Sequence, residues 1–144
     1  MATQVSVIGS GTEHERAAEE VGRLLAARGC VVVTGGLGEV MAAAHRGAKA
    51  AGGTTIAILP GERRTDANPW ADHVVVTGVG HARNLAVAAS GDAVIAVGGS
   101  WGTLAEIAFA MRLGRRVVVV DGPSVEGVPR AATPAEAVDA VLGR

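Results

Sequence analysis

Residues 94–106 read Val-Ile-Ala-Val-Gly-Gly-Ser-Trp-Gly-Thr-Leu-Ala-Glu, and this stretch decides the fold. An apolar run with strand character ends in a glycine-rich turn, and a helix is expected to start at Thr103 with Glu106 in its first turn. Glycines let the backbone approach a ligand because no Cβ is in the way. The first N–H groups of a helix have no partner within it, so they form an anion site that commonly takes phosphate. The stretch therefore predicts a site for a ligand that carries a phosphate and a sugar.

Short apolar runs alternate with helical patterns along the rest of the chain. We expect strands at 4–8, 30–34, 54–59, 73–77, 92–97 and 116–120, and helices at about 13–28, 39–51, 81–90, 103–113 and from Pro134, with Thr133 as its N-cap. Strands that are apolar throughout are typical of burial on both faces. The predicted fold is α/β: a single domain over 1–144, built as a three-layer Rossmann-like sandwich around a mainly parallel sheet of six or seven strands. By analogy with related sheets we expect the strand order 4-3-2-1-5-6, which places the turns after strands 1, 2 and 5 side by side.

Composition and charge exclude several classes of protein. A hydrophobic share of 49% argues against disorder, and a formal net charge of -1 argues against nucleic-acid binding through bulk charge. Cys30 is the only cysteine, which excludes an intrachain disulfide and a cysteine-based zinc cluster. The four histidines show no metal spacing, so no metal site is expected. No membrane span or signal pattern is visible, and we expect a cytoplasmic protein without a membrane partner.

The glycine turns resemble those of a known family. Residues 98–106 resemble the PGGxGTxxE signature of the LOG (LONELY GUY) family, residues 34–41 resemble its GGxxGLM turn, and Arg83 falls where the family has its arginine. The chain is identified as a LOG-like member of the SLOG superfamily. It is most similar to a shorter branch that includes the plant and algal molybdenum-cofactor carrier protein. LOG enzymes are cytokinin-activating phosphoribohydrolases, often mislabelled as lysine decarboxylases. Lys49, the only lysine, is expected within a helix away from every glycine turn, so we expect no lysine decarboxylase.

The predicted site gathers glycine turns and a few polar side chains at one edge of the sheet. Glu106 has a second interpretation as the end of a capping box that starts at Thr103, and Arg83 has one as a solvated helix residue. Glu39 is a plausible polar contact or a helix cap. The resemblance implies catalytic roles for Glu106 and Arg83 if the chain is an enzyme. The residues expected to bind the ligand or its phosphate are Ser10, Gly11, Gly35, Gly36, Gly38, Glu39, Arg83, Asn84, Gly98, Gly99, Ser100, Gly102, Thr103 and Glu106.

Three functions stay open from the sequence. The first is binding of a nucleotide or of a nucleotide-like ligand such as the pterin molybdenum cofactor, with no cofactor required for activity. The second is hydrolysis of the base–ribose bond of nucleoside 5′-monophosphates. The third, ranked last, is a nucleotide-sensing module. The helix at 103–113 is apolar almost all round. In the superfamily that the chain resembles, the corresponding helices form dimers, so the resemblance implies a homodimer that can assemble into a higher homo-oligomer.

Overall fold

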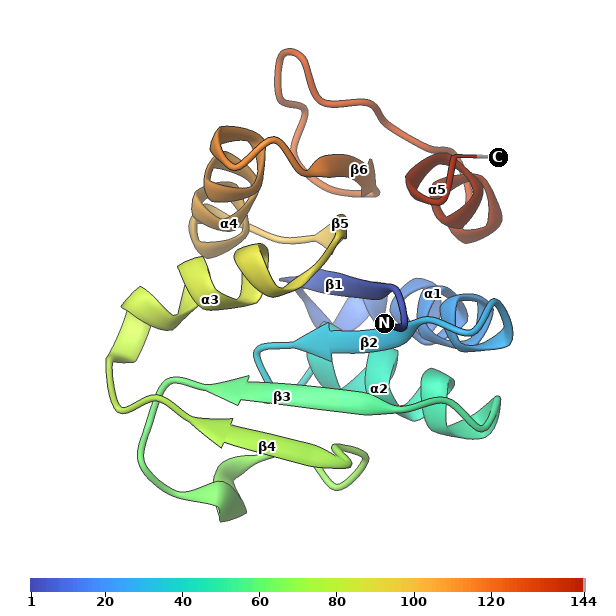
Figure 1. Cartoon of the computed structure of the whole chain (residues 1–144). Helices are drawn as coiled ribbons and strands as arrows, with labels where there is room; N and C mark the ends of the chain where they lie inside the picture. Colours follow the sequence, from blue (N-terminus) through green and yellow to red (C-terminus); the bar gives the residue numbers. More distant parts are fainter. Residues whose placement is uncertain (144) are drawn as a thin grey trace.

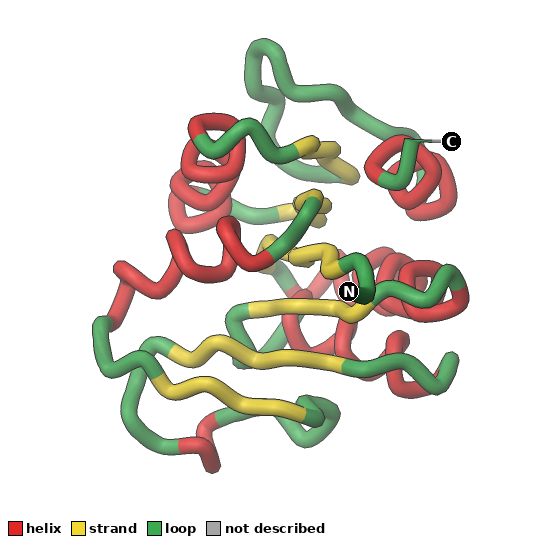
Figure 2. The backbone as a smooth tube through the Cα atoms, viewed as in Figure 1, coloured by secondary structure: helices red, strands yellow, loops and turns green. Residues whose placement is uncertain are grey.

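The sheet contains six parallel strands in the order β4-β3-β2-β1-β5-β6. We describe residues 1–143 of a computed structural model, shown in Figures 1 and 2. The predicted fold class and strand order are both confirmed, and the sheet has six strands. The strands are β1 (Gln4–Ser10), β2 (Val31–Thr34), β3 (Thr55–Leu59), β4 (His73–Val76), β5 (Ala93–Gly98) and β6 (Arg116–Val120).

Helices cover both faces of this sheet. Figure 1 shows α3 and α4 on one face and α1, α2 and α5 on the other. The helices are α1 (Glu15–Ala27), α2 (Val40–Ala50), α3 (Arg83–Ser90), α4 (Trp101–Arg112) and α5 (Pro134–Val141). Thr133 caps α5 as predicted: its side chain accepts a hydrogen bond from the Glu136 N–H. Within residues 1–143, no helix is both long enough and apolar enough to cross a membrane.

Each central strand contributes to two cores. On β5, Ile95 and Val97 pack with α1, α2 and α5, whereas Val94 and Ala96 pack with α3 and α4. Successive side chains of a strand point to opposite faces, so burial on both faces requires apolar residues at every position. This explains why the strands read as continuous apolar runs rather than as alternating ones.

The helices α1 and α2 touch each other backbone to backbone. A Cβ at Gly22 of α1 would lie 1.9 Å from the carbonyl oxygen of Ala44, and a Cβ at Gly47 of α2 would lie 1.9 Å from that of Glu19. A glycine inside a helix costs about 1 kcal/mol relative to alanine. These two glycines are therefore explained by packing, because any side chain at either position would push the helices apart.

Helix starts differ from the expectation at three places. Short 3₁₀ turns at Thr12–His14 and Gly80–Ala82 precede α1 and α3, which begin two residues later than predicted. Helix α4 begins at Trp101, two residues before the predicted start. Glu106 consequently lies in the second turn of α4 and not in the first. The alternative interpretation of Glu106 as part of a capping box is also wrong, because Thr103 is already inside the helix.

Candidate ligand-binding site

A cavity of about 210 Å³ opens at the carboxyl edge of the sheet, between the ends of β1 and β2 and the first turns of α2, α3 and α4. Its walls come from segments that are far apart in the sequence. This is the position at which ligands bind in parallel α/β sheets, where the strand order reverses. The residues that line it are Val7, Ile8, Gly9, Ser10, Gly35, Met41, Arg83, Asn84, Ser100, Gly102, Thr103 and Glu106.

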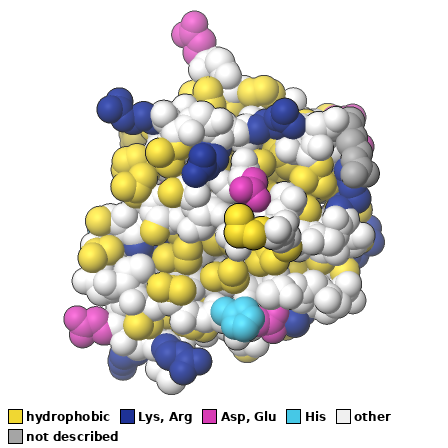
Figure 3. Space-filling view, viewed as in Figure 1, with side chains coloured by type: hydrophobic (Ala, Val, Ile, Leu, Met, Phe, Trp, Pro, Cys, Tyr) yellow, Lys and Arg dark blue, Asp and Glu magenta, His cyan; other side chains and the backbone are white. Residues whose placement is uncertain are grey.

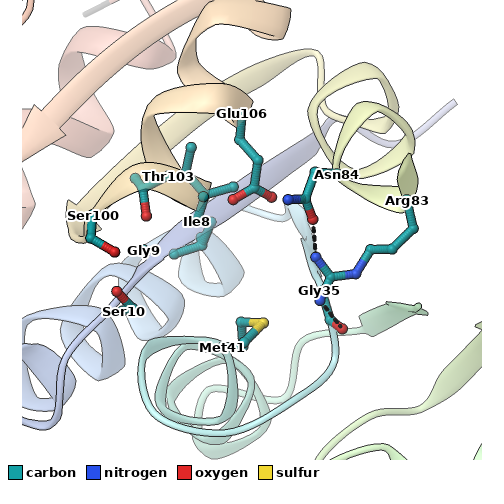
Figure 4. A pocket seen from close by; sticks show the side chains of 12 residues that line it. Ile8, Gly9, Ser10, Gly35, Met41, Arg83, Asn84, Ser100, Thr103 and Glu106 are labelled. Atoms are coloured by element: carbon teal, nitrogen blue, oxygen red, sulfur yellow. Dashed lines mark hydrogen bonds between the residues drawn. The ribbon is translucent and has the colours of Figure 1, made fainter. Parts of the chain in front are cut away.

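One end of the cavity is suited to an anion. Figure 4 shows the hydroxyl groups of Ser10, Ser100 and Thr103 at this end, beside the start of α4. Ser100 occupies the N-cap position of α4, but its side chain makes no capping hydrogen bond. The first N–H groups of α4 have no partner within the helix, and they carry the positive end of its dipole. Hydroxyl donors and free N–H groups together favour a phosphate or another anion here.

Two predicted glycines shape the turn before α4 without lining the cavity. Gly98 and Gly99 have positive φ values of 62° and 110°, which side chains rarely adopt. A Cβ at Gly98 would lie 2.2 Å from the His14 ring, and a Cβ at Gly99 would lie 2.2 Å from the Thr103 hydroxyl. Both glycines therefore make room for neighbouring side chains. The closeness of His14 to Gly98 could not be predicted from the sequence, because the two residues are 84 positions apart.

The opposite end of the cavity carries a fixed arginine. Arg83 is 9% exposed, and its guanidinium donates to the Asn84 side-chain oxygen and, over 3.4 Å, to the Gly35 carbonyl. Its Nε is buried without a hydrogen-bond partner. Burial lowers the pKa of Arg83, and the nearby Glu106 counteracts part of that shift. Because the Asn84 oxygen faces Arg83, the Asn84 amide nitrogen is turned toward the cavity.

Glu106 is the acidic side chain of the cavity. It projects from the second turn of α4 and is 8% exposed. Within residues 1–143 its carboxylate has neither a hydrogen-bond partner nor an ion pair within 4 Å. Burial raises its pKa to about 7, and the positive charge of Arg83 opposes this shift. Near neutral pH the group can therefore accept a hydrogen bond, donate one, or exchange a proton with a ligand.

The remaining wall of the cavity is apolar. Val7 and Ile8 contribute from β1, and the thioether of Met41 lies across from Glu106 (Figure 4). Gly35 lies at the base of this wall, and a Cβ there would lie 2.7 Å from an Arg83 nitrogen and 2.9 Å from the Met41 sulfur. Its missing side chain thus makes room for Arg83 and Met41. An apolar wall facing several directional polar groups is typical of a small-molecule site.

Of the fourteen residues predicted to bind the ligand, eight line the cavity and six do not. Glu39 has a positive φ of 54°, and its carboxylate accepts a hydrogen bond of 3.2 Å from the Gly11 N–H. It therefore ties the turn after β1 to the turn after β2. The nominated residues that line the cavity are Ser10, Gly35, Arg83, Asn84, Ser100, Gly102, Thr103 and Glu106; those that do not are Gly11, Gly36, Gly38, Glu39, Gly98 and Gly99.

Trp101 and Lys49 both lie outside the cavity lining. Trp101 is 84% exposed at the first position of α4. Lys49 lies near the other end of α2, where its Nζ donates to the Gly53 carbonyl over 2.9 Å and pairs with Asp72 over 2.8 Å. The lysine therefore does not reach the cavity. Among residues 1–143, no group of three His, Cys, Asp or Glu side chains is arranged to hold a metal ion.

A family model covers nearly the whole chain: residues 2–141 match the SLOG cluster4 family. The chain belongs to this family. An uncharacterised protein of Archaeoglobus fulgidus is 47% identical over 141 residues, which are 94% of this chain and 92% of that protein. The resemblance inferred from the glycine turns is thus confirmed at the level of the family.

Solved structures of the same fold include two proteins linked to the molybdenum cofactor. The molybdenum cofactor binding protein of Rippkaea orientalis has a TM-score of 0.93 at 30% identity, with 99% of this chain and 97% of that chain covered. The molybdenum cofactor carrier protein of Chlamydomonas reinhardtii has a TM-score of 0.90 at 33% identity, with 99% and 98% covered. A DNA processing protein A of Helicobacter pylori, whose single-stranded DNA binding has been described, has a TM-score of 0.72. At 18% identity, with 98% of this chain and 80% of that chain covered, it shares the fold alone.

Proposed function

We propose that this chain binds a phosphorylated, nucleotide-like small molecule in the cavity at the carboxyl edge of the sheet. The main support for the proposal is that one cavity combines an end suited to an anion with an end that carries directional polar side chains. One end offers hydroxyl groups and the uncapped start of α4, and the other offers Arg83, Asn84 and a Glu106 carboxylate without a protein partner. A phosphate at the first end and a polyol or heterocycle at the second would satisfy both.

The ligand class includes nucleoside 5′-monophosphates and the pterin cofactor of molybdenum. The second is supported by the two solved structures at 30% and 33% identity, which belong to proteins that bind or carry this cofactor. The residues present fit either ligand, since both contain a phosphate and a flat ring. The ring would lie against the apolar wall of Val7, Ile8 and Met41. In both cases the ligand is cargo or substrate, and the whole chain acts as one binding domain.

Hydrolysis of the base–ribose bond is the second candidate, and the state of Glu106 favours it. A transition state with oxocarbenium character gains stability from a nearby carboxylate. Glu106 is buried and unpaired, so its ionised form, which gains population above its pKa of about 7, would act through a medium that screens little. Arg83 would orient the departing base or anchor the phosphate. As a hydrolase, the protein would release a free base and ribose 5-phosphate.

Calorimetric titration with a panel of nucleoside 5′-monophosphates, including N6-substituted adenylates, tests the binding proposal. Release of ribose 5-phosphate is followed in the same samples. We expect binding that Ser100→Ala and Arg83→Ala weaken, whereas Glu126→Gln, in an exposed loop, leaves it unchanged. Turnover that Glu106→Gln abolishes would establish the hydrolase, and binding without turnover would leave a carrier. If no monophosphate binds, the pterin molybdenum cofactor is tested next, and the proposal fails if that also does not bind.

Nucleic acid is not the expected ligand. Figure 3 shows lysine and arginine side chains spread over the visible face rather than gathered in one patch. A single-stranded oligonucleotide therefore enters the same titration as a competitor. Displacement of a bound monophosphate by the oligonucleotide at moderate salt would argue against a small-molecule site.

We also propose that two copies associate through the exposed apolar side of α4. Trp101 and Met111 of α4 are exposed, and so are Leu113, just after its end, and Leu85 of the neighbouring α3. A single domain rarely leaves so many large apolar side chains in water unless a partner covers them. Light scattering should give the mass of a dimer, and Met111→Arg should give that of a monomer. A wild-type monomer at high concentration would overturn this proposal.

A further inference from the structure

A buried chain of polar groups lies beneath the turn that follows β2, outside the ligand cavity. His45 of α2 is completely buried, although the rest of that helix is mostly alanine and glycine. Its Nε2 lies 3.2 Å from the Thr34 hydroxyl, and its Nδ1 lies 3.2 Å from the Asn68 amide nitrogen. Buried polar groups are seldom kept without a structural or functional reason. Neither the cavity lining nor the proposed function accounts for His45.

The hydrogen bonds determine which nitrogen of His45 carries the proton. The Trp70 N–H donates to the Asn68 side-chain oxygen over 3.0 Å, so the Asn68 amide nitrogen must face His45. The two hydrogens of this amide are shared among Nδ1 and the carbonyls of Gly36 and Leu37. An amide nitrogen cannot accept, so a proton on Nδ1 would have no acceptor there, and Nδ1 is the nitrogen without a proton. Burial lowers the pKa of His45 to about 4, so the ring is neutral at physiological pH. A neutral ring has one proton, which is then on Nε2 and is donated to Thr34.

The same chain of bonds holds the turn on both sides of Gly35. The Thr34 hydroxyl oxygen also accepts from the Gly36 N–H over 2.9 Å. The Gly36 carbonyl in turn accepts from the Asn68 backbone N–H over 2.8 Å. The carbonyl of Gly35, the residue between Thr34 and Gly36, accepts from the Arg83 guanidinium. The position of Arg83 in the cavity thus depends on a turn that His45 and Asn68 hold from below.

We propose that His45 is a positioning residue of the ligand site: its Nε2–H form braces the turn at Thr34–Gly36, and this turn holds the Arg83 guanidinium opposite Glu106. His45 itself touches no ligand. Only the ligand-binding part of the test rests on the proposed function. The tautomer and the bracing are properties of the protein without ligand.

The ligand-free protein provides the first test. The ¹⁵N spectrum of the His45 ring should show a protonated Nε2 and a bare Nδ1. Replacing His45 with leucine should accelerate hydrogen exchange of the Gly36 amide by about tenfold, the change expected from one buried hydrogen bond. Gln offers an amide N–H and an oxygen on a chain of similar length, so His45→Gln should restore most of the protection. Val138→Ala, a buried substitution in α5, controls for a general loss of stability.

A double-mutant cycle provides the second test, with adenosine 5′-monophosphate as the probe. His45→Leu should weaken binding by about tenfold in the wild-type background and have little effect in an Arg83→Ala background, because the two residues act as one unit. A purely structural role would weaken both backgrounds equally. If the wild-type protein does not bind this probe, the nucleotide part of the proposed function has failed and the ligand-free test alone decides. A protonated Nδ1, or a Gly36 amide that His45→Leu leaves protected, would overturn the inference.

Discussion

His45 and Glu106 are both buried and both favour their neutral form, but they differ in their partners. Burial lowers the pKa of His45 to about 4 and raises that of Glu106 to about 7. Both ring nitrogens of His45 face protein groups, whereas the Glu106 carboxylate has no hydrogen-bond partner within residues 1–143. A satisfied buried group stabilises the backbone around it, while an unsatisfied one costs stability until a ligand binds. His45 therefore belongs to the part of the protein that supports the site, and Glu106 belongs to the part that is free to bind a ligand.

The largest expected effect comes from Glu106→Gln at alkaline pH. The folded protein holds a proton on Glu106 up to about pH 7, and the unfolded chain loses it near pH 4.5. The free energy of unfolding therefore falls as pH rises through this window, by about 3 kcal/mol in total. Urea unfolding should find Glu106→Gln more stable than the wild type at pH 8 and about equal to it at pH 4. A difference that does not change with pH would show that Glu106 is not the buried acid described above.

An effect of similar size and opposite sign is expected from His45. Its pKa of about 4 in the folded state lies below the unfolded value of 6.5, so stability is lost as pH falls through this range, by about 3 kcal/mol. Between about pH 4.5 and 6.5 the contributions of His45 and Glu106 oppose each other. Wild-type stability should therefore change little in that window, while His45→Gln should become less stable as pH rises. The measurement is a set of urea curves for both proteins at half-unit pH steps.

Two asparagines offer a smaller contrast of the same kind. Asn68 bonds to His45 and to two backbone carbonyls, whereas the Asn84 amide nitrogen faces the cavity. Removal of Asn68 leaves several buried groups without partners, and we expect Asn68→Ala to destabilise the fold by about 2 kcal/mol. Asn84→Ala should cost less than half as much but weaken ligand binding more. Thermal unfolding and calorimetric titration of both variants check the order, and the reverse order would contradict the division proposed here.

The smallest expected effect distinguishes two helix starts. The Thr133 hydroxyl accepts from the Glu136 N–H at the start of α5, whereas Ser100 makes no such bond at the start of α4. Thr133→Ala should cost about 1 kcal/mol of stability, as is typical of a lost N-cap. Ser100→Ala should stay within about 0.5 kcal/mol and act on ligand binding instead. Equal losses in urea unfolding would mean that Ser100 has a capping role after all.

The sheet and its strand order could be predicted because burial on both faces leaves a plain pattern in the sequence. Runs such as 94–97 are apolar at every position, and the glycine turns mark where each strand ends. The position of the site followed from the same reasoning. The start of α4 could not be predicted, because Trp101 and Gly102 look like turn residues and Thr103 like a cap.

The buried hydrogen bonds that support the site could not be predicted from the sequence, because they join residues that are distant along the chain. His45 and Asn68 are 23 residues apart, and no spacing rule connects them. The sequence did contain one indication: a histidine among alanines at a buried helix position is expected to have hydrogen-bond partners. The roles of Gly35 and Gly99 also depend on contacts in three dimensions. Both glycines make room for protein side chains, whereas the sequence suggested that they make room for a ligand.

The close approaches of Gly22 to Ala44 and of Gly47 to Glu19 set the spacing between α1 and α2. A single methyl group at either position would collide with the backbone of the other helix and push the two helices apart. Met41 lies six residues before Gly47, about 9 Å along α2 at 1.5 Å per residue, so a tilt of the helix at the crossing would move the thioether at the rim of the cavity. The spacing of two helices on the face of the sheet opposite α3 and α4 therefore bears on the position of Met41 in the cavity wall.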